Sequence, residues 1–180
     1  MTAGLEGRLT VDDIHQSLSG AYIKSLQVFH FAFAMGVLVL FFVVLFTYLQ
    51  SPPVPDTGDT SLMDLLTFAH LVYALAAYGG SVLVHRSIVS HALADGVRMY
   101  SAERALAGLR TASVVRLAIL EAVAFFGLVV LFLSIQQGTL QVNPSYWVNL
   151  TSTVVLLAFV GWSFPSREKL ELLVSRRMQP

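Results

Sequence analysis

The sequence contains no cysteine, which excludes disulfide bonds, thiolate metal sites and haem attached through cysteine. Charge is also scarce, because Asp, Glu, Lys and Arg make up only 12% of the 180 residues. The eleven acidic residues balance the eleven basic ones, so net charge gives no electrostatic basis for binding nucleic acid. No phosphate-binding loop, nucleophile elbow or zinc signature occurs in the chain. We therefore expect no enzyme activity, no metal, no cofactor and no nucleic-acid partner.

Long apolar runs dominate the sequence. Hydrophobic residues make up 56% of the chain, and the mean hydropathy is +0.70. A helix needs about 20 apolar residues to cross a bilayer; three runs reach that length, and a fourth is shorter and more polar at its start. These runs predict an all-α, integral membrane four-helix bundle, built as one domain (1–180) from two antiparallel hairpins. The predicted transmembrane spans are 26–49, 62–84, 112–135 and 146–164.

The basic residues predict the orientation of the chain. All eleven lie before the first span, between the second and third, at the start of the third, or after the fourth. Cytoplasmic loops carry the excess of Lys and Arg, so we expect 1–25, 85–111 and 165–180 in the cytoplasm. The loops 50–61 and 136–145 then face the periplasm. This pattern predicts a multi-pass protein of the bacterial inner membrane with both termini in the cytoplasm.

The cytoplasmic segments have helical character of their own. The Ala, Leu and Arg content of 85–111 predicts a helical loop. The amphipathic stretch that ends at Lys24 predicts a short N-terminal surface helix, and 167–177 predicts a C-terminal one. A weak internal repeat is also visible, which favours two hairpins with a common ancestor, as in some transporters. A shift of 81 residues places small residues of the second span on those of the fourth, Ala77 on Ala158 and Gly80 on Gly161.

One carboxylate interrupts the third span. Glu121 lies about 13 Å above the predicted inner boundary, close to the middle of a bilayer, when the helix rises 1.5 Å per residue. A charged side chain at that depth costs at least about 2.5–3.5 kcal/mol, so an intramembrane ionisable residue is a functional hypothesis by default. Because apolar surroundings disfavour the charged form, we expect Glu121 to be protonated at neutral pH unless a partner holds the charge.

Depth in the membrane ranks the partners that the chain offers to Glu121. Tyr73 of the second span lies nearest in level, at about 15 Å, and His30 or His70 follow as partners through water. Since His30 and His70 differ in depth by more than about 10 Å, they do not predict a haem held between them. Small residues predict close packing of the second span on the third, because they let two backbones approach: Ala77, Gly80, Ala118 and Ala122.

Two interpretations of Glu121 stay open. In the first, the carboxyl group binds a proton and takes part in proton transport. In the second, the acid form hydrogen-bonds to a neighbouring helix and serves packing alone, and the chain is a structural or accessory subunit of a larger membrane complex. Both interpretations place the chain in a lipid bilayer, as a homo-oligomer or as one subunit of a complex.

A family resemblance covers the same segment, about residues 107–133. Leu109-Arg110-Thr111, Ala118, Glu121-Ala122, Ala124 and Phe126-Gly127 resemble the second helix of the F-type ATP synthase c subunit, the proteolipid whose ring turns as protons pass. In that family a carboxylate follows the loop arginine by eleven residues, the separation of Arg110 and Glu121 here. The resemblance implies that Glu121 corresponds to the ion-carrying carboxylate. The longer cytoplasmic segment and the two further spans depart from the family pattern.

Overall fold

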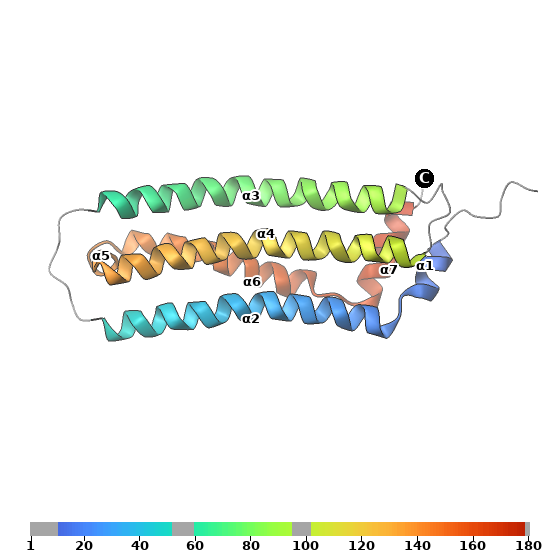
Figure 1. The fold of residues 1–180 in the computed structure, drawn as a ribbon, viewed down its shortest axis with the longest axis horizontal. Coiled ribbons are helices and arrows are strands. Elements are labelled where there is room, and N and C mark those ends of the chain that lie inside the picture. The colour runs from blue at the N-terminus through green and yellow to red at the C-terminus, as the bar shows by residue number, and fades with distance from the viewer. Residues whose placement is uncertain (1–10, 52–59, 95–101, 179–180) are drawn as a thin grey trace, which may run out of the picture. The chain divides into compact units, whose positions relative to one another are not determined.

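The computed structural model describes residues 11–51, 60–94 and 102–178, and every regular element in these ranges is helical. The long helices are α2 (Gly20–Gln50), α3 (Ser61–Ala94) and α4 (Ala102–Gln136), all labelled in Figure 1. The all-α prediction is thereby confirmed for the described residues. The shorter elements are α1 (Val11–Ser17), α5 (Thr139–Val142), the 3-10 helix η2 (Pro144–Leu150), α6 (Thr151–Ser163) and α7 (Arg167–Met178).

Among the described residues, four helices are long and apolar enough to cross a membrane: α2, α3, α4 and the continuous run of η2 and α6. Each of them contains one of the apolar runs found in the sequence. A helix is the expected form of such segments, because it satisfies every backbone polar group internally where lipid offers no hydrogen bonds. Helices α3 and α4 extend past the predicted spans, to Ala94 and from Ala102, into the segment predicted as a helical loop.

The contacts within the chain fall into two compact units. That the chain is one membrane domain stays a prediction. The first unit comprises the chain up to His30, Val82–Arg116 and the chain from Phe164 onward. The second unit comprises Phe31–Ser81 and Leu117–Ser163. Helices α2, α3 and α4 each contribute a segment to both units, so the division is not visible in the hydropathy of the sequence.

The first unit is built around the two short terminal helices. Its α1 and α7 contact each other, and both were predicted as short helices at these places. The hydroxyl group of Tyr22 donates a 2.8 Å hydrogen bond to the carbonyl of Leu106, and the Gln27 amide donates a 3.0 Å bond to the carbonyl of Pro165. Eight buried residues form the core of this unit: Ile14, Leu18, Val89, Ala105, Leu106, Leu109, Ala112 and Val174.

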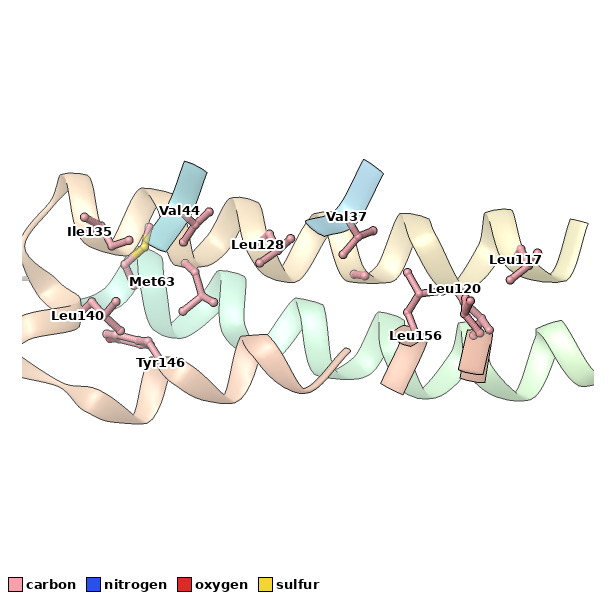
Figure 2. Close-up of a cluster of buried hydrophobic side chains, with 13 residues drawn as sticks. Val37, Val44, Met63, Leu117, Leu120, Leu128, Ile135, Leu140, Tyr146 and Leu156 are labelled. Atoms are coloured by element: carbon pink, nitrogen blue, oxygen red, sulfur yellow. The ribbon is translucent and has the colours of Figure 1, made fainter. Parts of the chain in front are cut away.

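The second unit has the larger core, drawn in Figure 2. Val37 and Val44 come from α2, Met63 from α3, and Leu140 and Tyr146 from the chain after α4. Helix α4 contributes the longest row, with Leu117, Leu120, Ala124, Leu128, Leu131 and Ile135 all buried. The spacing of three to four residues in this row places one face of α4 inside the unit. The second unit also contains Glu121 and the buried His70, which are described below.

Candidate functional site

The carboxyl group of Glu121 lies against a glycine of α2. A Cβ atom at Gly36 would stand 3.1 Å from Oε1 of Glu121 and 3.7 Å from the ring of Phe125. Because Gly36 has no side chain, the carboxyl group of Glu121 can occupy the space beside it. Glu121 is half-buried, and among the residues that the structure describes none forms a hydrogen bond or an ion pair with it. The site consists of an acid in apolar surroundings, without a polar partner from the described chain.

The partners predicted for Glu121 have contacts elsewhere. The ring of Tyr73 is exposed and meets Phe126 at 6.1 Å between ring centroids. The His70 ring hydrogen-bonds to Ser152. His30 belongs to the first unit, where its Nδ1 lies 2.9 Å from the carbonyl of Leu26. Tyr73 and His70 do not meet Glu121 because of the rotation of α4 about its axis, which turns Glu121 toward α2 and Phe126 toward α3.

The small residues predicted to pack α3 on α4 do not mark a close contact in the structure. Ala118 and Ala122 are exposed, and Ala77 is half-buried. A Cβ atom at Gly80 would meet no atom within 4 Å. Small residues at helical spacing occur on lipid-facing as well as on helix-facing surfaces, so the pattern alone does not choose between them. Close approaches to α4 occur instead at Gly127 in the second unit and at Gly108 in the first, where an added Cβ atom would collide with Ala92 of α3.

Three pairs of polar side chains join α3 to η2 and α6, and we call them the polar ladder. Tyr146 donates to Asp64 at 2.7 Å, Asn149 donates to Thr67 at 2.9 Å, and His70 Nε2 lies 3.1 Å from the hydroxyl oxygen of Ser152. In every pair the two residues are 82 positions apart, so both elements advance in the same direction and in register.

Local geometry explains why this short stretch presents a polar row. Asn143 caps η2 by accepting a 3.1 Å hydrogen bond from the backbone N–H of Ser145, and Pro144 follows as the first helical residue. In a 3-10 helix the side chains at i and i+3 eclipse, so Tyr146 and Asn149 lie one above the other. The row therefore follows from the 3-10 conformation as well as from the residue types.

Gly127 of α4 lies directly against the inner end of the polar ladder. A Cβ atom there would collide with the carbonyl oxygen of Asn149, and it would stand 2.8 Å from the Ser152 hydroxyl oxygen and 2.9 Å from His70 Nε2. The neighbouring Phe126 places its ring edge-on to His70, with 5.7 Å between ring centroids. Helix α4 thus approaches this polar cluster as closely as a helix backbone can.

The inner end of the polar ladder is buried. His70 is 1% exposed, Asn149 0% and Ser152 2%. A single Ser or Asn in an apolar helix does not by itself predict a site. Only the two spacings taken together indicate the row. Polar residues occur at every third position in α3, at Asp64, Thr67 and His70, and again at Tyr146, Asn149 and Ser152.

No set of three or more His, Asp or Glu side chains gathers as ligands for a metal ion among the described residues. Comparison with protein-family models, with curated proteins and with solved structures found no match.

Proposed function

We propose that this chain is a multi-pass membrane protein that binds and releases a proton at Glu121 inside the bilayer. The observation that carries the proposal is the placement of the carboxyl group beside Gly36 without a polar partner in the described chain. An acid in that position is most stable when protonated, since the charged form has no compensating donor.

The same observation weakens the purely structural interpretation of Glu121. A carboxylic acid that serves packing donates a hydrogen bond to the neighbouring helix, and α2 offers a glycine at the contact. The resemblance of 107–133 to the rotor proteolipid supports the proton-binding role, because it assigns the ion-carrying carboxylate to the same residue. The long cytoplasmic segment and the additional spans favour a role other than that of a rotor subunit.

The proposal includes a setting for this chemistry. The chain lies in a bacterial inner membrane with both termini in the cytoplasm, as the distribution of Lys and Arg predicts. It forms two hairpins of common ancestry and acts as a homo-oligomer or as one subunit of a membrane complex. Glu121 is half-buried, and we propose that a neighbouring subunit at its exposed part supplies the polar path by which a proton reaches it from water.

A lipid-soluble carbodiimide tests the proposal, because such reagents modify the acid form of a carboxyl group. The purified protein in lipid nanodiscs should be labelled once, at Glu121, and labelling should fall as the pH rises. Glu121→Gln should abolish the labelling without loss of folding. The matched control is Glu103→Gln on the same helix, where the exposed carboxylate is replaced and labelling at Glu121 should persist.

Proton movement supplies the functional half of the test. In liposomes that carry a potassium diffusion potential and an entrapped pH dye, the wild-type protein or its native complex should move protons, and Glu121→Gln should not. If Glu121→Gln assembles and supports proton movement as the wild type does, the proton-binding role is wrong and the accessory role takes its place. Absence of carbodiimide labelling at every pH would contradict the protonated, accessible carboxyl group.

A further inference from the structure

The polar ladder joins an exposed carboxylate to a buried imidazole. Asp64 is exposed near the start of α3, and His70 lies six residues further along, about 9 Å deeper at 1.5 Å per residue. Thr67 lies between them on the same helix, and Tyr146, Asn149 and Ser152 face them at matching levels. Polar atoms therefore continue from the end of the helix to the His70 ring.

Hydrogen bonding fixes the role of Asn149 in this arrangement. Its amide nitrogen donates to the Thr67 hydroxyl oxygen and to the carbonyl of Tyr146, each at 2.9 Å. Both amide hydrogens are then used. The side-chain oxygen of Asn149 carries no hydrogen and can only accept a hydrogen bond. That oxygen is buried and accepts no hydrogen bond from the described residues. The cluster around His70 is therefore rich in acceptors.

The Ser152 hydroxyl group has one hydrogen and two acceptors within reach. One acceptor is His70 Nε2 at 3.1 Å, and the other is the carbonyl of Asn149 at 3.3 Å. When the ring is neutral with its hydrogen on Nδ1, the hydroxyl group donates to Nε2. When both ring nitrogens carry hydrogen, Nε2–H donates to the hydroxyl oxygen and the hydroxyl group turns to the Asn149 carbonyl. Rotation of one hydrogen accommodates either protonation state without movement of a heavy atom.

The second ring nitrogen, Nδ1, is buried and has no hydrogen-bond partner among the described residues. The hydrogen on Nδ1 is present in both states described above, so the neutral and the charged ring have the same surroundings on this side.

We propose that His70 is a second proton-binding site, in which Nε2 takes up a proton and the Ser152 hydroxyl group turns to the Asn149 carbonyl. The proton is taken up from water and returns to water on release, so the one bond that forms and breaks on the protein is N–H. The neutral imidazole becomes an imidazolium, and no electron is exchanged. This inference is independent of Glu121, whose carboxyl group lies on the α2 side of α4.

Few charged groups act on His70 from the elements packed around it. On α3 the nearest acid is Asp64, which accepts the hydrogen bond of Tyr146 from η2. Helix α4 presents Phe126 and Gly127, which do not titrate. The α2 segment of the second unit contains no acidic or basic residue. Among the described residues, Asp64 is therefore the one acid in the polar ladder.

Nitrogen-15 NMR of the histidine rings tests the inference on the intact chain in nanodiscs. The sequence has five histidines, and replacing His15, His30, His85 and His91 one at a time assigns the His70 signals by elimination. As the pH is lowered below neutral, Nε2 of His70 should change from the unprotonated to the protonated chemical shift. His91 is exposed and serves as the control position.

Substitutions of Ser152 separate proton binding from simple packing. Ser152→Ala should displace the midpoint of the His70 titration, whereas Ser152→Thr, which keeps a hydroxyl group, should restore it. The inference is wrong if the two His70 nitrogens keep their chemical shifts as the pH is lowered while the nitrogens of the exposed His91 ring change theirs. It is also wrong if His70 titrates with the same midpoint in both Ser152 variants. Carbodiimide labelling of Glu121 is unaffected by either result, so the two proton-binding proposals fail separately.

Discussion

Replacement of Gly127 by alanine adds one methyl group at the tightest point between α4 and the polar ladder. The methyl group would collide with the Asn149 carbonyl oxygen, which belongs to the backbone and has no rotamer to adopt. It would also press on the Ser152 hydroxyl oxygen and on His70 Nε2, at 2.8 and 2.9 Å. Either α4 moves away from η2 and α6, or the pair of His70 and Ser152 breaks.

The structure allows the size of this effect to be worked out. Overpacking of a tight core typically costs about 1–3 kcal/mol, and the upper end applies here because a backbone atom is in the way. Loss of one buried hydrogen bond adds about 1 kcal/mol. The better helix propensity of alanine returns about 1 kcal/mol. We therefore expect Gly127→Ala to lower the free energy of unfolding by about 3 kcal/mol.

Two other glycines supply matched controls for the same substitution. A Cβ atom at Gly79 or at Gly80 of α3 meets no atom within 4 Å. Gly79→Ala and Gly80→Ala should leave stability unchanged or raise it by no more than about 1 kcal/mol. The assay is reversible unfolding by SDS in mixed detergent micelles, followed by circular dichroism. If Gly127→Ala stays within about 0.5 kcal/mol of the wild type, the close contact is absent and the reasoning fails.

Two further predictions concern the outer end of the polar ladder and the orientation of the chain. Tyr146→Phe removes the hydroxyl group that donates to Asp64, and it should lower stability by about 1 kcal/mol in the same unfolding assay, because the exposed carboxylate regains water. An equal loss in an Asp64→Ala background, which has no acceptor at this position, would show that the pair does not interact. For orientation, a cysteine at the exposed Gln137 should react with an impermeant maleimide added to intact cells, and a cysteine at Ala102 should react only after lysis. Labelling of the second position in intact cells would reverse the predicted topology.

The helices were predictable because an apolar segment in lipid must satisfy its backbone hydrogen bonds internally, and a helix does so. Each apolar run long enough to span a bilayer is a helix in the structure. Their ends were less predictable, since hydropathy falls at the first charged residues while the helix continues through them. Thus α3 continues to Ala94, past the predicted boundary at Val84, through residues that include Arg86 and His91.

The candidate site was predictable only in part. Glu121 stands out because one acid in an apolar run is costly, and no knowledge of other helices is needed to notice it. Its neighbours depend on how far α4 is rotated about its axis, and the sequence periodicity does not fix which helix faces which side. Asn149 and Ser152 belong to the site only because they pair with Thr67 and His70 of α3, and the sequence of one helix does not show that pairing.

The equal spacing of the two polar rows has a consequence for how the helices hold their alignment. A slide of one helical turn would bring Thr67 level with Tyr146 and His70 level with Asn149, so two polar pairs would form again in the shifted alignment. The polar ladder by itself therefore discriminates weakly between two alignments one turn apart. Gly127 breaks that degeneracy, because it is the α4 residue without a side chain that the Asn149 carbonyl approaches. In this chain a single missing methyl group sets the alignment that the hydrogen bonds then stabilise.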